Sequence, residues 1–214
     1  MTIRLYVFST AAVFFAAVVG YAFGRSRLYS FQNRGEAKLT RSLQHHFNAP
    51  DYHLMNNVTL RVKGGTTQVD HILVSRFGVF VIETKNYQGW IFGDPKQAKW
   101  TQVIYRRKSR FQNPLLQNFK HLRAVQDLLD FLPADTVKPI VVFTGSAIFK
   151  TETPQGVFTI AGFIDHLNGQ TQEVLSLNRV QFCVGRLESV RLALTRKTDV
   201  EHVEGLRRRY GSAD

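Results

Sequence analysis

The chain has 214 residues, which is enough for one domain of ordinary size with short appendages. Apolar residues make up 44% of it, so the composition allows a real core, and the single cysteine, Cys183, excludes an internal disulfide. A net charge of +12 favours a polyanionic partner, either nucleic acid or an anionic membrane surface. Cys183 lies in the apolar run VQFCVG and is predicted to be a buried small hydrophobe.

Residues 5–23, LYVFSTAAVFFAAVVGYAF, form a 19-residue stretch without a charge. A helix of that length measures about 28 Å, close to the ~30 Å hydrocarbon layer of a bilayer. Tyr6 and Tyr21 lie near its ends, where aromatic rings favour the membrane interface. We therefore predict one N-terminal transmembrane helix.

A cleaved signal peptide is the alternative for this segment, but its apolar region would be shorter, about 7–15 residues. Arg25 and Arg27 follow the stretch directly, and basic residues there resist translocation. The positive-inside rule places the N-terminus outside and the folded part in the cytoplasm. We expect a single-pass protein of the cell inner membrane.

The next segments predict a helix followed by an antiparallel meander. Residues 35–47 carry an apolar stripe at helical spacing. Strands are expected at 52–60, 66–75 and 77–85, because these apolar runs are joined by short turn signals.

The second half predicts a strand excursion and then a crossover. Residues 89–107 suggest two strands turned at Gly93-Asp94-Pro95, and 113–132 a helix capped by Asn113 with Pro114 in its first turn. A buried strand at 137–145 then implies a parallel or mixed sheet centre. A short strand at 156–160 and two or more helices over 162–210 complete the chain.

Two carboxylates and one lysine stand out in the meander. Glu83 and Lys85 are two residues apart on a strand and therefore share a face. With the turn centred near Arg76, an antiparallel register brings Asp70 level with Glu83, or one residue off. Such charges are costly to desolvate, and a divalent cation would offset the repulsion between the acids. Oxygen ligands suit Mg²⁺ or Mn²⁺, and a lysine beside them can hold water and stabilise a phosphorane-like transition state.

The blocks GE, TQVDHILVSRFGVFVIETKNYQGWIFGD, W and NPLLQNFKHL resemble the NERD (nuclease-related) domain, a proposed relative of the PD-(D/E)XK nucleases. The resemblance covers about residues 33–145. It implies an α/β fold, an αβββαβ core with a mixed sheet, with a metal site at one sheet edge. Val69 stands where that superfamily often has proline, and His121 stands where a related branch has tyrosine. The residues that match the superfamily's site are Glu36, Asp70, Glu83, Lys85 and Gln117, with Asp70, Glu83 and Thr84 as the metal ligands.

Structural roles compete with each assignment. Glu36 has capping-box spacing from Asn33, Asp70 could accept turn hydrogen bonds, and Gln117 could simply bond His121 on a solvated helix face. Glu83 and Lys85 could form a surface ion pair at a frayed strand end.

Aromatic and basic residues add two further expectations. Trp90 and Trp100 are predicted to pack across the hairpin, with stacking on an extruded base as the alternative. YRRKSR is either a solvated loop or a phosphate-binding patch made by Arg106, Arg107, Lys108 and Arg110.

The resulting hypothesis is a membrane-anchored nuclease that uses Mg²⁺ or Mn²⁺ on DNA or RNA, with DNA the favoured partner. The alternatives are a non-catalytic nucleic-acid-binding or signalling module on the same fold, and a tethered scaffold that holds lipid. The expected divisions are a transmembrane anchor at 1–24, a juxtamembrane linker at 25–34, a nuclease-like core at 35–145, and a C-terminal strand and helical extension at 146–214.

Overall fold

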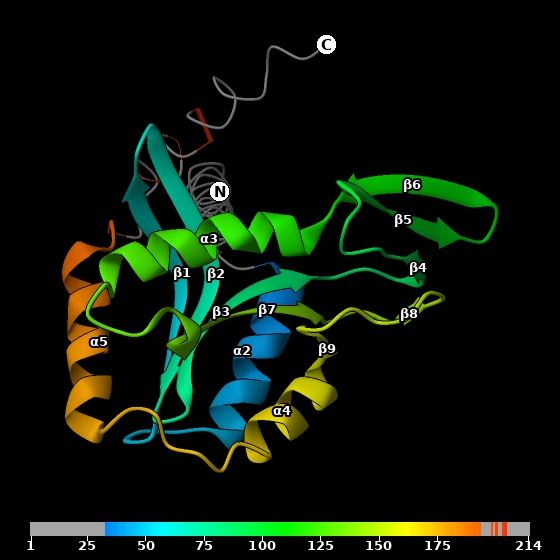
Figure 1. Cartoon of the computed structure of the whole chain (residues 1–214). Helices are drawn as coiled ribbons and strands as arrows, with labels where there is room; N and C mark the ends of the chain where they lie inside the picture. Colours follow the sequence, from blue (N-terminus) through cyan, green and yellow to red (C-terminus); the bar gives the residue numbers. More distant parts are fainter. Residues whose placement is uncertain (1–32, 194–197, 199, 201–202, 205–214) are drawn as a thin grey trace, which may run out of the picture. The chain divides into compact units, whose positions relative to one another are not determined.

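The computed structural model describes residues 33–193, 198, 200, 203 and 204 (Figure 1). Its core elements follow the order that the sequence predicts, with a helix, an antiparallel meander, a strand excursion, a crossover helix and a further strand. In chain order they are α2 (Arg34–His46), β1 (Tyr52–Val62), β2 (Gly65–Ser75), β3 (Gly78–Lys85), β4 (Gly89–Phe92), β5 (Lys99–Ile104), β6 (Arg107–Gln112), α3 (Pro114–Leu128), the 3₁₀ turn η1 (Ala134–Thr136), β7 (Val137–Phe143), β8 (Ala147–Phe149), β9 (Val157–Thr159), α4 (Ile160–Asn168) and α5 (Leu177–Val190).

The main sheet has five strands in the order β1-β2-β3-β7-β9. β1, β2 and β3 are antiparallel neighbours, whereas β3, β7 and β9 run parallel. The parallel pair requires a crossover between β3 and β7, and α3 supplies it. The predicted meander, crossover and mixed α/β sheet are therefore confirmed.

Helices cover both faces of this sheet (Figure 1). α3 and α5 pack on one face, where Leu122, Val125 and Cys183 join the inward residues of the strands. α2 and α4 pack on the other face, through Leu39, Leu43 and Phe163 among others. Both faces of the central strands are thus buried, which explains their continuous apolar runs. Cys183 is buried as predicted.

The excursion between β3 and α3 is larger than expected. Its strands β4, β5 and β6 form a second sheet, which β8, from the chain after β7, completes in the order β6-β5-β4-β8. The turn after β4 and the pairing of β4 with β5 are confirmed, while the strands β6 and β8 were missed. The chain leaves the first sheet for the second just after β3 and just after β7. At this point Gly145, which follows β7, lies against the backbone of Tyr87, which follows β3. A Cβ at Gly145 would come within 2.0 Å of the Tyr87 carbonyl oxygen.

The expected Trp90–Trp100 pair is wrong. Trp90 lies opposite Val103, and Trp100 lies opposite Phe111 on the other side of the sheet. Trp100 is fully buried, and Trp90 is 49% exposed. The error has a physical cause, since the turn after β4 is longer than the sequence suggested and shifts the register of β5.

Some element ends also differ. α3 ends at Leu128 instead of residue 132. β9, predicted at 156–160, spans Val157–Thr159, and the side chain of Thr159 caps α4. The predicted membrane-spanning segment 5–23 lies outside the described residues. Within the described residues, no helix has the length and apolarity needed to cross a bilayer.

Candidate active site

Asp70 and Glu83 lie across from each other on β2 and β3. The antiparallel register pairs His71 with Ile82, and one step further along the two strands Asp70 stands opposite Glu83, as the sequence predicted. The ladder between the two strands stops at this point, and the Thr84 N–H instead donates to Asp70 Oδ2 at 2.7 Å. Asp70 therefore bonds across the sheet rather than within a turn.

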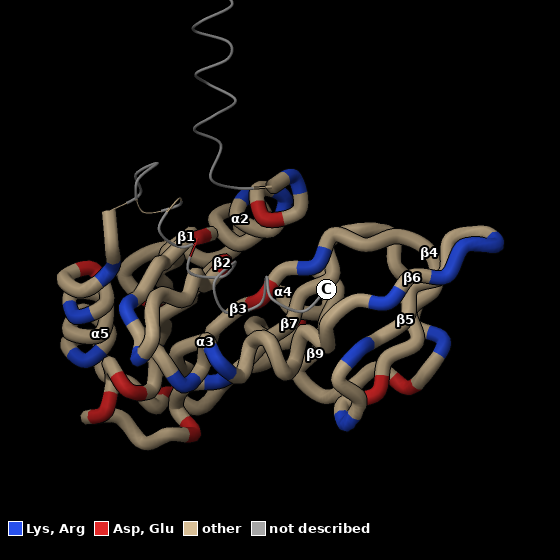
Figure 2. Tube along the Cα trace, turned by 90° about the horizontal axis from the view of Figure 1, so that it is seen from above, with Lys and Arg blue, Asp and Glu red and all other residues tan. Residues whose placement is uncertain are grey.

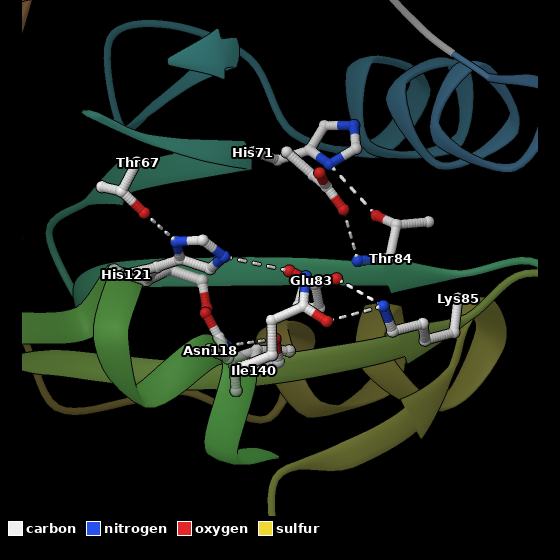
Figure 3. Close-up of polar contacts among 11 residues, drawn as sticks. Thr67, His71, Glu83, Thr84, Lys85, Asn118, His121 and Ile140 are labelled. Carbon is white, nitrogen blue, oxygen red and sulfur yellow. Dashed lines mark hydrogen bonds and ion pairs between the residues drawn. The ribbon is translucent and has the colours of Figure 1, made fainter. Parts of the chain in front are cut away.

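Lys85 joins β3 to α3. Its Nζ donates to Glu83 Oε1 at 2.7 Å and to Gln117 Oε1 at 3.0 Å (Figure 3). The Glu83 side chain is 3% exposed and the Lys85 side chain 16%, so the alternative of a surface ion pair is wrong. An ammonium held by two oxygens in this way has a fixed position at the mouth of the site.

His121 occupies the inner side of Glu83. Thr67 Oγ1 lies 2.8 Å from its Nδ1, and its Nε2 lies 3.3 Å from Glu83 Oε2. The latter approach lacks hydrogen-bond geometry, so within the described part of the chain neither Nε2 nor Oε2 has a hydrogen-bond partner. The alternative of a Gln117–His121 pair on a solvated face is wrong, because His121 is buried and Gln117 contacts Lys85.

Asn118 fixes how α3 sits on the sheet. It is fully buried, and its amide donates to the Val81 carbonyl at 2.9 Å and to the Ile140 carbonyl at 2.8 Å. These two carbonyls belong to neighbouring strands, so one side chain joins α3 to both β3 and β7. Sequence reasoning missed it, although a polar residue in the apolar stripe with Leu122 and Val125 is a usable signal.

His71 supports the site from the opposite face. Its ring lies between Thr40 Oγ1, at 3.0 Å from Nε2, and Thr84 Oγ1, at 3.3 Å from Nδ1. Burial lowers the pKa of His71 to about 4, against the opposing effects of the Glu36 backbone carbonyl and the Glu83 charge. The imidazole is thus neutral, and it links α2 to the strand that carries Glu83 and Lys85.

The carboxylates differ in their ionisation. Burial raises the pKa of Asp70 well above its usual range, and the charges of Glu83 and Glu36 raise it further. Burial also raises the pKa of Glu83, but His121 and Lys85 together outweigh it, so this pKa lies below its usual range. Glu83 therefore ionises at a lower pH than Asp70. Glu36 is 8% exposed, and its effect on Asp70 places it near the same end of the strands.

The residues fit a hard divalent cation in their chemistry. Two carboxylates face each other, a third raises the pKa of one of them, and the buried Oε2 of Glu83 has His121 Nε2 at 3.3 Å but no contact of hydrogen-bond geometry with the described residues. N–H and C=O of one residue in a strand point to the same side, so the Thr84 carbonyl faces Asp70 as its N–H does. No group of three or more His, Cys, Asp or Glu side chains in the described chain is arranged to hold a metal. A cation here would thus rely on one or two carboxylates, a carbonyl and water, a pattern that Mg²⁺ accepts.

The basic residues lie on a different element. Arg106 is in the turn between β5 and β6, while Arg107, Lys108 and Arg110 lie on β6. The run is thus mostly a strand of the second sheet, at the β5–β6 end of the trace (Figure 2). All four side chains are exposed. The structure brings Asp70, Glu83, Thr84, Lys85 and Gln117 together and leaves the basic run outside that group.

Comparison with known proteins agrees with this arrangement. The NERD family, described as a nuclease-related domain, matches residues 32–144. An uncharacterized protein of Bacillus anthracis is 45% identical over 101 residues, which is 47% of this chain and 48% of that protein. The chain thus spans about half the length of the curated relative it matches. No solved structure gives a significant match.

Proposed function

This chain belongs to the NERD, or nuclease-related domain, family, and on that premise we propose that it is a membrane-anchored, metal-dependent nuclease. It would hydrolyse phosphodiester bonds of DNA or RNA. The observation that carries the proposal is the convergence of Asp70, Glu83 and Lys85 at one end of β2 and β3, with Lys85 bonded to both Glu83 and Gln117.

Asp70, Glu83 and the Thr84 carbonyl would hold Mg²⁺ or Mn²⁺. When bound, such an ion supplies Lewis-acid polarisation of the phosphodiester and neutralises charge in the transition state. The lowered pKa of Glu83 and the raised pKa of Asp70 support this role, since a cation would offset the burial and the repulsion from Glu83 and Glu36 that raise the pKa of Asp70.

Lys85 would act on the water and the phosphate. An ammonium has three N–H donors, and Lys85 uses two of them to bond Glu83 and Gln117. These two bonds fix the direction of the third N–H. That donor can hold the attacking water or stabilise the negative charge that grows on the phosphoryl oxygens. Water then adds to phosphorus and loses a proton, the phosphorus–oxygen bond to the leaving group breaks, and the leaving oxygen takes up a proton, so that the water supplies OH to phosphorus and H to the leaving group.

Gln117 and Glu36 would orient the site. Gln117 places Lys85 through its Oε1, and Glu36 adds negative charge beside Asp70. The exposed basic residues Arg106, Arg107, Lys108 and Arg110 would bind the phosphate backbone. Residues 1–24 would anchor the chain in the inner membrane, with the folded part in the cytoplasm.

Cleavage by the full-length chain tests this proposal. Single- and double-stranded DNA and RNA are incubated with Mg²⁺ or Mn²⁺, with EDTA as the blank. Lys85→Ala should lower the rate at least 100-fold, about 2.7 kcal/mol of barrier, whereas Lys63→Ala, on an exposed turn, should leave it unchanged. Cleavage that persists in Lys85→Ala would overturn the catalytic assignment.

Metal binding separates this function from a non-catalytic module on the same fold. Titration of Mn²⁺, followed by its paramagnetic resonance signal, should show binding that Asp70→Asn and Glu83→Gln each weaken. Both replacements keep the side-chain shape. The binding module would show no Mn²⁺ affinity that depends on these two residues.

A further inference from the structure

The second sheet has one face that the core does not cover. Trp90 on β4 pairs with Val103 on β5 and with Ile148 on β8, and Val103 pairs with Lys108 on β6. Residues directly opposite in a sheet share a face, so these four side chains form one row across all four strands.

A second row lies beside the first. Phe92 pairs with Thr101, and Thr101 pairs with Arg110. Lys150, two residues after Ile148, continues this row, and its Nζ lies 4.7 Å from the centre of the Trp90 ring. We call the set Trp90, Phe92, Ile148, Lys108, Arg110 and Lys150 the aromatic–basic face.

The opposite side of the same sheet is core. Ile91 and Trp100 are fully buried there, and Phe111 and Phe149 pack with them against Phe143 of the main sheet. On the aromatic–basic face, by contrast, Ile148 is 56% exposed, Trp90 49% and Phe92 39%. Large apolar side chains exposed together on one face indicate an interaction site.

We propose that the aromatic–basic face binds single-stranded nucleic acid, an inference that names the substrate class of the proposed nuclease and therefore rests on it. Bases would stack on Trp90 and Phe92, and Lys108, Arg110 and Lys150 would contact the phosphates. Only unpaired, unstacked bases present a free ring face, which is why an exposed sheet with aromatic residues selects single strands over duplex. The charge of the face is complementary, because its three ionisable side chains are all cations.

The position of Lys150 is consistent with such a ligand. Its ammonium lies over the Trp90 ring, so one cation and one aromatic ring already share a site. A base that stacks on this ring would take the place of the ammonium, which is then free to pair with the neighbouring phosphate.

The chain also connects this face to the candidate active site at two points. β4 begins at Gly89, four residues after Lys85, and four residues span at most about 14 Å. On the other side, β6 ends at Gln112, and α3 follows with Gln117 in its second turn. A nucleic-acid single strand bound to the aromatic–basic face would thus lie next to the residues proposed for hydrolysis.

Binding is tested with the full-length chain in EDTA, where no metal-dependent cleavage occurs. Labelled 12-mers of deoxythymidine and of uridine, and a duplex of equal length, are titrated by fluorescence anisotropy. Trp90→Ala and Phe92→Ala should each weaken single-strand binding by about five- to 100-fold, the loss of one stacked base. Phe182→Ala, which removes a ring 58% exposed on α5, is the matched control and should change nothing.

Two further readouts address the ring and the charges. The chain has two tryptophans, and Trp100 is buried, so quenching of the exposed Trp90 reports a stacked base directly. Trp90→Phe should keep most of the affinity and lose the quenching. Arg110→Ser should lower the slope of log affinity against log salt by about 0.7, the loss of one phosphate contact on a single strand.

Unchanged single-strand affinity in both Trp90→Ala and Phe92→Ala would overturn the proposal. So would a Trp90 signal that responds to phosphatidylglycerol vesicles but not to the oligonucleotides, because this face would then bind a membrane surface. The nuclease proposal and the binding proposal can fail separately. If the wild type does not cleave, only the nuclease proposal is overturned, because binding is measured in EDTA. If Trp90→Ala cleaves fully and binds as the wild type does, only the role of the aromatic–basic face is overturned.

Discussion

His71 is a buried base held neutral by its surroundings. Its ring is fully buried between Thr40 and Thr84, where a positive charge would lose its hydration. The Glu36 carbonyl and the Glu83 charge favour protonation but do not outweigh burial, so the pKa of His71 falls to about 4. The unfolded chain takes up this proton near pH 6.5, and the folded chain does so only near pH 4.

The sign of the resulting pH dependence follows. Between pH 6.5 and about 4 the unfolded state binds more protons at this residue, so folding stability decreases as the pH decreases. Lowering the pH from 7 to 5 should cost about 2 kcal/mol of unfolding free energy from His71 alone. His71→Gln has no such titration and should lose less. Urea denaturation of both forms in EDTA measures the difference.

Asp70 also titrates, but it does so in both the wild type and His71→Gln, so its effect on stability cancels in the comparison. The pKa of Asp70 is raised by burial and by Glu83 and Glu36, so its contribution has the opposite sign, and stability falls as the pH rises toward that pKa. Both forms keep Asp70, and the difference between them isolates His71. Parallel pH profiles for the wild type and His71→Gln would contradict a buried neutral imidazole.

At the scale of single residues, the sequence identified those site residues whose chemistry is unusual for their position. An acid in the middle of a strand and a Glu-x-Lys at the end of its neighbour are visible because burying charge is costly, and strand register then placed Asp70 opposite Glu83. His121 and Asn118 were not assigned, because the sequence does not show what they bond to, even where Asn118 interrupts the apolar stripe with Leu122 and Val125. Their partners, Glu83 and the two strand carbonyls, are far away in the sequence.

At the scale of elements, the second sheet depends on one of the two tryptophans. Trp100 contacts Phe111, Phe143 and Phe149, and its indole N–H donates to the Asp94 carbonyl at 2.8 Å. Phe143 belongs to β7, so Trp100 attaches the second sheet to the first. Trp90 faces outward and has Lys150 over its ring.

Trp100→Ala should therefore destabilise the fold by about 3–5 kcal/mol, the cost of removing a fully buried aromatic ring. Trp90→Ala, made on the opposite face of the same sheet, should cost less than about 1 kcal/mol because its ring is half exposed. Denaturant midpoints followed by circular dichroism compare the two. Equal losses would show that both rings contribute to the core, and Trp100→Phe, which keeps part of the packing, should lie between them.

Element types were predictable where periodicity was long and uniform. The meander, the crossover helix and the buried strand after it all show such patterns, and all are present. β6 was missed because its sequence, RKSRFQ, has no apolar alternation: every residue except Phe111 is exposed, on both faces, and its pairing with β5 is made by the backbone. β8 has only three residues, which is too short for any period to show.

At the scale of the whole molecule, charge and hydropathy divide the chain. The described part carries a site and a basic face, and the uncharged stretch 5–23 precedes it in the sequence. A nuclease of net charge +12 that is free to diffuse would meet nucleic acid throughout the cell. Attachment to a membrane would confine it to substrates that approach that surface, which gives the proposed anchor a physical consequence beyond location.

The anchor prediction is tested by placing two charges in the apolar stretch. Each lysine near the centre of a transmembrane helix costs about 2.5–3.5 kcal/mol of insertion free energy, so the double variant Val13→Lys, Ala16→Lys should move the protein from the carbonate-washed membrane pellet to the supernatant. The matched variant Val13→Leu, Ala16→Leu should stay in the pellet. The intact mass of the wild type should include residues 1–24, and protease added outside spheroplasts should leave the folded part uncut. A mass that lacks the stretch would identify a cleaved signal peptide, and digestion from outside would reverse the orientation and remove the folded part from cytoplasmic nucleic acid.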